Sequence, residues 1–344
     1  MTRYALLVAP SANRVYAAQA ARLTAAELSA FAERGLGGRV YDIAGTVLAG
    51  VPYLGFAADE PLGEADLAYL SRVSTAYALY EVEGDRLRPV ALPPSLRYDE
   101  DLLTIPKYPG KTNEQFTQLL LNLTVLASSR AGQMLTRRLV VLDPLCGRGT
   151  TLHIALRYGY DAIGIEADGG HVDAYAAFLR TWLRRKRLKH RVEAHPVRHG
   201  GRRVARKLAA TVAPSLAAHK SGDVQRLTVY HADTIDARAF LRAGCCDVVV
   251  ADAPYGVVHG SRTPEAVRRD PRDLLAAAVP VWAELLRHGG AMGVSFNTHV
   301  LPAADFADLL AGEGLEVVTS PAYQDLSHWV DQGITRDLVV ARKP

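Results

Sequence analysis

The stretch Leu139–Thr151 (LVVLDPLCGRGTT) constrains the fold of this chain more than any other. A short apolar run ends at Asp143, the chain passes through Gly147 and Gly149, and a helix-like segment follows. A buried strand, a glycine turn and a helix N-terminus in this order are typical of α/β proteins that hold a nucleotide-like ligand at the carboxyl edge of a sheet. The stretch therefore predicts an α/β fold with a ligand site at this turn.

Strand-like and helix-like runs alternate around this turn. A helix over residues 112–130, capped by Thr112 or Asn113, leads into it. The expected elements that follow are strands in residues 161–168, 226–233, 246–256 and 290–299, helices in residues 171–190, 271–290 and 302–314, and a closing hairpin of residues 315–323 and 335–344. This alternation predicts a doubly wound, mostly parallel sheet, with which an antiparallel last strand is compatible.

The first part of the chain has a different pattern. Residues 1–92 read as βαββαβ with one extra strand, a small α+β unit of ferredoxin-like type. Residues 93–111 are rich in proline and predict a linker between domains. Residues 112–344 would then form the second domain, and 344 residues are enough for two hydrophobic cores.

Composition excludes several other classes of protein. Hydrophobic residues make up 49% of the chain and charged residues 22%, which is ordinary for a soluble globular protein. No apolar run approaches the roughly 20 residues that span a bilayer, and the first residues lack a signal-peptide core. The three cysteines, Cys146, Cys245 and Cys246, have no zinc-like spacing and are too few for a disulfide framework. We therefore expect a cytoplasmic protein without a membrane partner or a bound metal.

Positive charge is concentrated in one segment. Residues 180–207 contain twelve Lys or Arg and a single acid, Glu193, although the net charge of the whole chain is only +4. Charge runs are commonly no more than a solvated surface, but this density indicates a polyanionic partner. The candidate nucleic-acid contacts are Arg184, Arg185, Lys186, Arg187 and Lys189, which we place at the end of the helix over residues 171–190.

Acidic residues stand at the ends of three expected strands. Asp143 suits a ligand with a positive group, such as the amino group of a methionine moiety. Glu166 can accept hydrogen bonds from two ribose hydroxyls, and Asp233 can reach an adenine edge. Asp168 is expected to cap the next helix. The turn lacks the Gly-Lys-Ser/Thr of a phosphate loop, and Leu152 stands where a dinucleotide fingerprint has its third glycine.

The strand over residues 246–256 ends in Asp252, Ala253, Pro254, Tyr255 and Gly256. One interpretation is a tight turn with a packed tyrosine. The more specific interpretation is a base-binding turn, in which the carboxylate and a backbone carbonyl accept both protons of an exocyclic amine while the aromatic ring stacks on the base. Held in this way, the amine directs its lone pair toward an incoming methyl group, which is catalysis by orientation.

These two stretches carry a resemblance to a known family. Asp143–Thr150 (DPLCGRGT) and Asp252–Gly256 (DAPYG) resemble motif I and motif IV of the class I S-adenosylmethionine-dependent amino-methyltransferases. More closely, the chain is similar to the tRNA guanosine-N2 methyltransferases of the putative RNA methylase family, and Phe116–Leu123 resembles the helix that closes over their cofactor. Two departures stand out. Ala253 replaces the usual first proline of motif IV, and residues 1–92 are too few for the additional THUMP domain of that family.

The resemblance implies a Rossmann-like methyltransferase fold, S-adenosylmethionine as cofactor and an exocyclic amine as methyl acceptor. It implies cofactor binding by Asp143, Cys146, Gly147, Gly149, Thr150, Glu166, Asp233 and Phe116. It implies catalytic roles for Asp252, Pro254 and Tyr255, with Ala253 and Gly256 at the target base. Guanine N2 in tRNA or another RNA is the favoured target. The alternatives are an adenine or cytosine amino group in DNA, and a nucleic-acid-binding protein that keeps the fold without catalysis.

Overall fold

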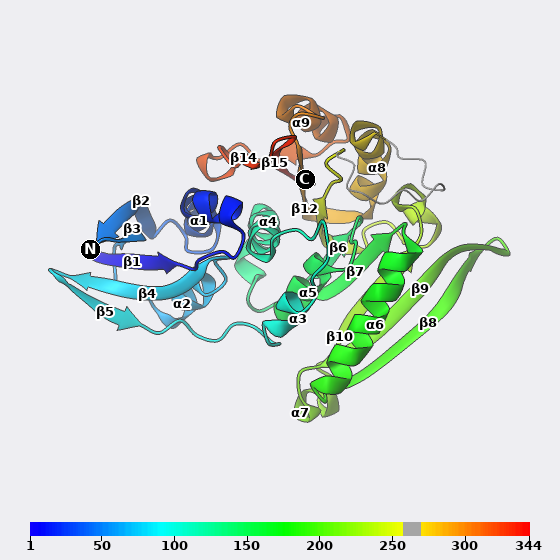
Figure 1. The fold of residues 1–344 in the computed structure, drawn as a ribbon, viewed down its shortest axis with the longest axis horizontal. Helices are drawn as coiled ribbons and strands as arrows, with labels where there is room; N and C mark the ends of the chain where they lie inside the picture. The colour runs from blue at the N-terminus through cyan, green and yellow to red at the C-terminus, as the bar shows by residue number, and fades with distance from the viewer. Residues whose placement is uncertain (257–269) are drawn as a thin grey trace.

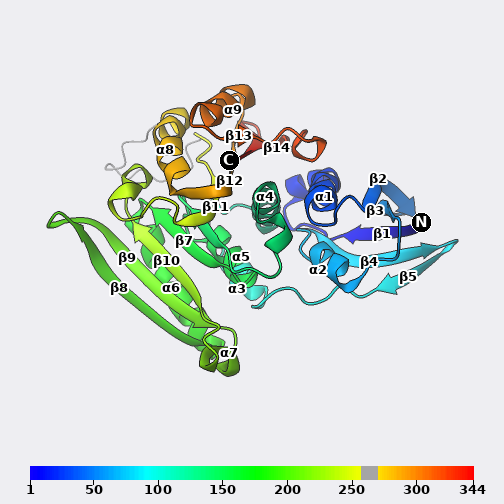
Figure 2. The same ribbon diagram turned by 180° about the vertical axis from the view of Figure 1, so that it is seen from behind.

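The computed structural model describes residues 1–256 and 270–344 and contains two β-sheets. A five-stranded sheet formed by the first part of the chain lies at one end of the molecule, and a larger sheet with helices on its faces forms the rest (Figure 1, Figure 2). No helix of the described residues is both long and apolar enough to span a membrane.

The smaller sheet has the order β2-β3-β1-β4-β5, and every neighbouring pair is antiparallel. Its elements are β1 (Thr2–Val8), α1 (Arg14–Arg34), β2 (Val40–Leu48), β3 (Val51–Ala58), α2 (Glu64–Leu70), β4 (Ala76–Glu83) and β5 (Arg86–Val90). This is the ferredoxin-like βαββαβ arrangement with one extra strand, and the prediction for the fold of this region is confirmed.

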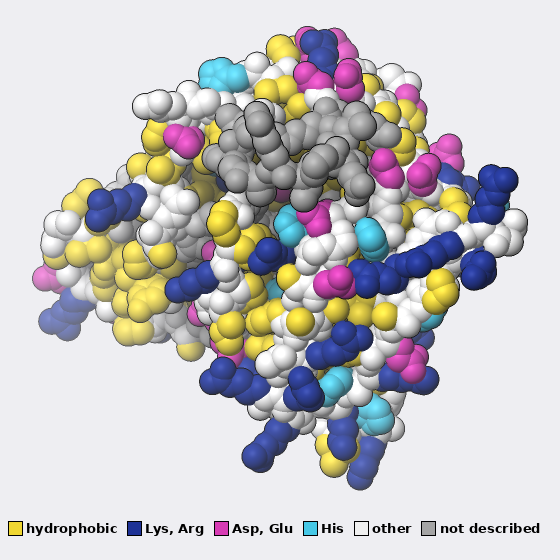
Figure 3. Space-filling view, turned by 45° about the vertical axis from the view of Figure 1, so that its right-hand side comes forward, with side chains coloured by type: hydrophobic (Ala, Val, Ile, Leu, Met, Phe, Trp, Pro, Cys, Tyr) yellow, Lys and Arg dark blue, Asp and Glu magenta, His cyan; other side chains and the backbone are white. Residues whose placement is uncertain are grey.

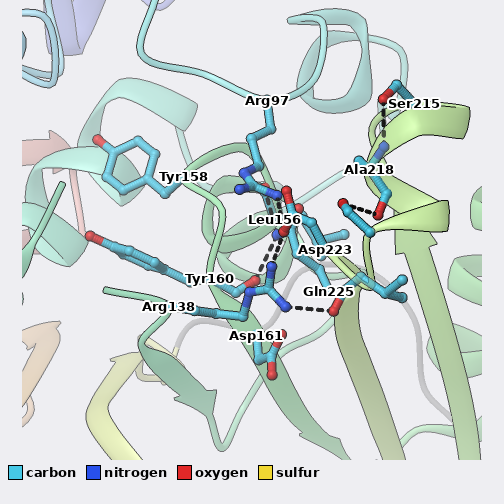
Figure 4. Close-up of polar contacts among 12 residues, drawn as sticks. Arg97, Arg138, Leu156, Tyr158, Tyr160, Asp161, Ser215, Ala218, Asp223 and Gln225 are labelled. Carbon is cyan, nitrogen blue, oxygen red and sulfur yellow. Dashed lines mark hydrogen bonds and ion pairs between the residues drawn. The ribbon is translucent and has the colours of Figure 1, made fainter. Parts of the chain in front are cut away.

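The proline-rich segment is fastened to the large sheet. It contains one short helix, α3 (Asp101–Thr104), and leads to α4 (Glu114–Ala127), which Asn113 caps by accepting a hydrogen bond from the Phe116 N–H at 3.0 Å. The Arg97 N–H donates to the Arg157 carbonyl at 2.7 Å. Arg97 and Arg138 converge on the carboxylate of Asp223 (Figure 4). The segment therefore has fixed contacts along its length.

The larger sheet has the order β13-β15-β12-β11-β6-β7-β10-β9-β8, and β14 pairs with β15 outside this path. Its strands and the helices between them are β6 (Val140–Asp143), α5 (Thr150–Arg157), β7 (Asp161–Glu166), α6 (Gly169–Arg185), β8 (Lys189–His199), β9 (Arg202–Ala213), α7 (Leu216–Lys220), β10 (Gln225–His231), β11 (Cys246–Asp252), α8 (Pro271–Leu285), β12 (Leu286–Asn297), α9 (Ala303–Gly312), β13 (Glu316–Val317), β14 (His328–Asp331) and β15 (Ile334–Arg342).

Five of these strands, β10, β7, β6, β11 and β12, are parallel neighbours, and β15 runs antiparallel between β12 and β13. The helices between them lie on both faces of the sheet, so it is doubly wound. Because all five parallel strands end at one edge, the polar residues that follow them are brought together there. The predicted Rossmann-like fold with an antiparallel last strand is confirmed, and the sheet as a whole is mixed, because β8, β9 and β14 also pair in antiparallel fashion.

The basic segment differs from its prediction. The expected helix through residue 190 is wrong, because α6 ends at Arg185 and Arg187 turns the chain with a φ of +54°. The chain continues as the β8–β9 hairpin, with Gly200 and Gly201 at its tip. Alternate residues of β9, among them Leu208, are buried on one face of the sheet, a period of two that fits a strand and not a helix.

The two sheets share one core. Buried residues of α1 and α4 belong to the same apolar cluster, which continues into the large sheet. Within it, the Asn122 amide donates to the carboxylate of Glu27 at 2.6 Å, and the Tyr158 hydroxyl donates to Asn122 at 2.9 Å. Burial raises the pKa of Glu27 to about 7. The first sheet is thus packed against α4 by apolar and polar contacts together. The domain boundaries at residues 92 and 112, which were drawn from the sequence, stay a prediction.

Candidate functional site

A large cavity opens at the carboxyl ends of β6, β7 and β11. Its volume is about 1630 Å³, above the roughly 300–1,000 Å³ of a typical small-molecule site, so a cofactor and a base-sized group fit together. The sequence-predicted residues that line it are Phe116, Asp143, Cys146, Gly147, Thr150, Glu166, Asp233, Asp252, Ala253, Pro254, Tyr255 and Gly256. The structure therefore brings the two motifs to one site.

The two glycines of the first motif have different roles. Gly147 has a φ of +51°, and a Cβ atom there would meet nothing within 4 Å, so its backbone faces open space at the cavity. Gly149 has a φ of +85° and precedes the first turn of α5, but a Cβ atom there would lie 2.2 Å from the ring of Tyr175. Gly149 does not line the cavity. It permits close packing of α6 against the turn, whereas we expected it to approach the ligand.

Glu166 ends β7 and holds the glycine turn. Its carboxylate accepts the Gly147 N–H at 2.8 Å and the Asp168 N–H at 2.7 Å. A carboxylate has about four acceptor positions, so two remain for a ligand. Asp168 caps α6 as expected, because its side chain accepts from the N–H groups of Gly170 and His171.

Asp143 ends β6 almost fully buried, and its side chain accepts the Leu145 N–H at 3.1 Å. Burial raises the pKa of Asp143 to about 7. Cys146 is also buried, and its sulfur lies where a Cβ atom on Gly164 would approach to 2.7 Å. The thiol therefore packs the turn against β7, and burial raises its pKa.

The remaining predicted cofactor residues stand around this turn. The Thr150 hydroxyl lies 3.4 Å from that of Tyr108. Asp233 caps the short helix η2 (Thr234–Ala239), and its carboxylate accepts the Ile235 N–H at 3.1 Å. Phe116 is fully buried in α4, with the Arg336 guanidinium 4.3 Å from its ring centre.

Asp252 is held by hydroxyl groups. Thr112, Ser295 and Tyr255 each donate a hydrogen bond to its carboxylate. The Tyr255 hydroxyl in turn accepts from the Arg336 Nε at 2.6 Å, and burial raises its pKa. The Asn297 amide donates to the Tyr255 carbonyl at 3.1 Å. The carboxylate is thus oriented by three neutral donors, and Tyr255 is fixed from both ends.

Several of these partners were missed by sequence reasoning. Ser295 and Asn297 end β12, so the strand-end rule that selected Glu166 could have found them. Arg336 comes from β15, and Tyr16 reaches the cavity from α1, with no motif at either position. Thr112 was considered only as a helix cap, a role that Asn113 fills.

The predicted nucleic-acid contacts lie far from the cavity. These residues, Arg184, Arg185, Lys186, Arg187 and Lys189, belong to the last turn of α6 and the start of β8. The first turn of α6 borders the cavity, and its 17 residues separate the two ends by roughly 25 Å. Lys186 pairs with Asp99 and Asp101 at 2.6 Å each. The structure does not bring these side chains to the site.

Among the described residues, no group of three or more His, Cys, Asp or Glu side chains is arranged to hold a metal ion.

No family model matches the chain, and no curated protein matches its sequence. Among solved structures, the T. thermophilus 16S rRNA N2 methyltransferase RsmC, in complex with AdoMet and guanosine, is 16% identical with a TM-score of 0.38, and the match covers 88% of this chain and 58% of that one. A TehB-like SAM-dependent methyltransferase from Corynebacterium glutamicum is 16% identical with a TM-score of 0.34, over 62% of this chain and 84% of that one. The strand order given above places the larger sheet in the Rossmann-like methyltransferase class.

Proposed function

We propose that this protein is an S-adenosylmethionine-dependent N-methyltransferase that modifies an exocyclic amino group of a nucleic-acid base, with guanine N2 in RNA as the favoured target. One observation carries the proposal. The Asp143–Gly147–Glu166 cluster and the Asp252–Tyr255 turn line a single cavity that is large enough for a cofactor and a base. A site that binds only a nucleotide would need the first of these two clusters and not the second, the Asp252–Tyr255 turn.

The charge of the cavity supports this cofactor. Among the described residues, no Lys or Arg nitrogen lies within 4.0 Å of the carboxylates of Asp143, Glu166 or Asp252, and only His171 comes as near as 3.9 Å to one of them, Glu166. Carboxylates without a directly bonded Lys or Arg favour a cationic ligand. S-adenosylmethionine carries an ammonium and a sulfonium group and, when bound, supplies an electrophilic methyl group.

The residues of the first cluster fit the parts of this cofactor. Asp143 would bind the ammonium group, the free acceptor positions of Glu166 would bind the ribose hydroxyls, and Asp233 would face the adenine edge. The open backbone at Gly147 leaves room for close approach of the ligand.

The second cluster is suited to hold an amine. The Ala253 N–H donates to the Ser295 carbonyl at 2.9 Å, so this turn is fixed even without the usual first proline. Asp252 and the Ala253 carbonyl would accept the two amine protons, which directs the nitrogen lone pair away from both acceptors and toward the methyl donor. As the nitrogen gains the methyl group it becomes positive, and the Asp252 carboxylate stabilises this charge. The methylated nitrogen is acidic and would then release one proton to solvent. Tyr255, fixed by Asp252 and Arg336, would stack on the base.

Replacement of Asp252 tests this mechanism. Asp252→Asn keeps the shape of the side chain and removes its charge, so methyl transfer to the RNA pool should fall at least about 100-fold. Cofactor affinity, measured by titration calorimetry, should stay within about twofold, because the first cluster is unchanged. Thr112→Val should give an intermediate loss of about tenfold by removing one of three donors, and Thr112→Ser, which keeps the hydroxyl, should be near wild type.

The substrate is tested by incubating the wild-type protein with labelled cofactor and separate pools of tRNA, rRNA and DNA. We expect label in an RNA pool, at guanine N2. Label in DNA alone would support the alternative substrate class. Full activity of the Asp252→Asn variant would refute the mechanism, and the absence of cofactor binding would favour a non-catalytic nucleic-acid-binding protein.

A further inference from the structure

The β8–β9 hairpin stands out among the surface features, because it carries exposed basic residues beyond the edge of the sheet where the cavity lies. We propose that this hairpin is a nucleic-acid-binding arm whose tip, formed by Arg198, Arg202 and Arg203, binds the phosphate backbone of the RNA whose base enters the cavity. This inference rests on the proposed function and adds the part of the molecule that holds the rest of the substrate.

The strand register places the tip on the cavity side of the sheet. Glu166, at the end of β7, is in register with His231 of β10, and His231 is in register with Arg206 of β9. β9 begins four residues earlier, at Arg202, so the tip extends roughly 13 Å past the carboxyl ends of the neighbouring strands. Figures 1 and 2 show the hairpin projecting from the body of the molecule.

The charges at the tip have no acidic partner among the described residues, although the Arg198 guanidinium donates a hydrogen bond to the Gly201 carbonyl at 3.2 Å. Arg198, Arg202 and Arg203 are exposed, and among the described residues none of them forms an ion pair. Other basic residues of the segment do: Arg206 pairs with Asp173 at 2.7 Å, and Arg191 pairs with Glu193 at 2.6 Å. In the space-filling view, Lys and Arg side chains gather on the part of the face that α6 and the hairpin occupy (Figure 3).

The tip also places like charges opposite each other. Arg198 is in register with Arg203. Directly opposed like charges destabilise a strand pair, so this arrangement has a cost in the free protein. A Cβ atom on Gly200 or Gly201 would meet nothing within 4 Å, so the two glycines of the turn are open to solvent. A bound polyanion would relieve the repulsion between the opposed charges.

The distance between the tip of the hairpin and Asp252 predicts which substrates the arm binds. β9 is four strands away from β11 in the sheet order, so the tip lies roughly 19 Å to the side of Asp252. A free base or a single nucleotide in the cavity cannot reach that far, whereas a folded RNA can. The arm should therefore affect binding of long substrates only.

A pair of matched variants tests the arm. The tip variant carries Arg198→Gln, Arg202→Gln and Arg203→Gln. The control variant, Arg184→Gln, Arg185→Gln and Arg187→Gln, loses the same charge at the far end of α6. Binding of a labelled tRNA transcript is followed by fluorescence anisotropy without cofactor, over a series of salt concentrations. The melting temperature of both variants is measured as a check on folding.

We expect the tip variant to bind tRNA at least tenfold more weakly than wild type and to melt no lower. The slope of its log binding constant against log salt concentration should fall by the equivalent of about two to three phosphate contacts. The control should bind within about twofold of wild type. An equal loss in both variants, or no loss at the tip, would overturn the proposal, as would preferential binding of duplex DNA of equal mass. The proposed function is judged separately, by methyl transfer: tip-dependent tRNA binding without transfer to any nucleic-acid pool would refute the methyltransferase and keep the arm.

Discussion

The two edges of the large sheet hold acidic residues differently. At the amino edge two acids pair with arginines: Asp247, the second residue of β11, lies 2.7 Å from Arg287, and Asp223, before β10, binds Arg97 and Arg138. At the carboxyl edge, Asp143 and Asp252 are held by N–H and O–H groups of neutral residues.

This difference separates a structural from a functional use of the same residue type. An acid paired with an arginine contributes to the native state and has little remaining attraction for a ligand. An acid oriented by neutral donors has no bonded cation of the protein and is open to a cation or an amine of a ligand. Removing an acid at the amino edge should therefore lower stability more than binding, and removing an acid at the carboxyl edge should lower binding more than stability.

The largest expected effect is on stability at the amino edge. Asp247→Ala leaves Arg287 unpaired and the Val140 N–H without its acceptor, so the free energy of unfolding should fall by about 3–4 kcal/mol. Urea unfolding measures the change. Asp252→Asn is the counterpart at the other edge and should change stability by less than about 1 kcal/mol. If the two variants lost equal stability, the distinction between the edges would fail.

A smaller effect separates the two glycines of the turn. Gly149→Ala combines a left-handed backbone with a 2.2 Å approach to Tyr175, so it should destabilise the protein by about 2–3 kcal/mol. Gly147→Ala has the backbone strain alone and should cost about 1 kcal/mol, but it should weaken cofactor binding more strongly, because its new methyl group enters open space at the cavity. Thermal unfolding and calorimetry measure the two effects. The opposite ranking of stabilities would contradict the assignment.

The smallest effect is a pH dependence. Burial raises the pKa of Asp143 to about 7, so the free protein holds this carboxyl largely protonated below pH 7. A cationic ligand favours the ionised form, and cofactor affinity should rise about tenfold from pH 5.5 to pH 7 with release of a proton. Calorimetry in buffers of different ionisation enthalpy measures both. Asp143→Asn should bind weakly with a flat profile, and a flat profile in the wild type would exclude the role of Asp143.

Local patterns predicted most of the fold. The glycine turn after Asp143 and the alternating runs that follow required only short-range information, and the parallel sheet follows from them. The β8–β9 hairpin was missed because the basic run continues the helical pattern of α6. The signal that could have found it is Gly200–Gly201 between two alternating runs, which is typical of a hairpin turn.

Only part of the site was predicted, because local patterns identify the residues at strand ends but not those that reach the cavity through long-range packing. Glu166 and Asp252 end parallel strands, so their convergence follows from topology alone. Arg336 and Tyr16 reach the cavity through the pairing of β15 with β12 and the packing of α1 on α4, and no local pattern encodes such contacts. The position of the basic residues depended on the hairpin, so the error in secondary structure also misplaced the predicted nucleic-acid contacts relative to the cavity.

The contribution of α1 to the cavity has a consequence for protein engineering. Asn13 and Tyr16 form part of the wall, and Glu27 of the same helix is hydrogen-bonded to Asn122 of α4. The first sheet therefore cannot be exchanged as a cassette. A chimera that joined the larger sheet to another N-terminal module would lose part of the cavity wall, and any transplant would have to carry α1 along.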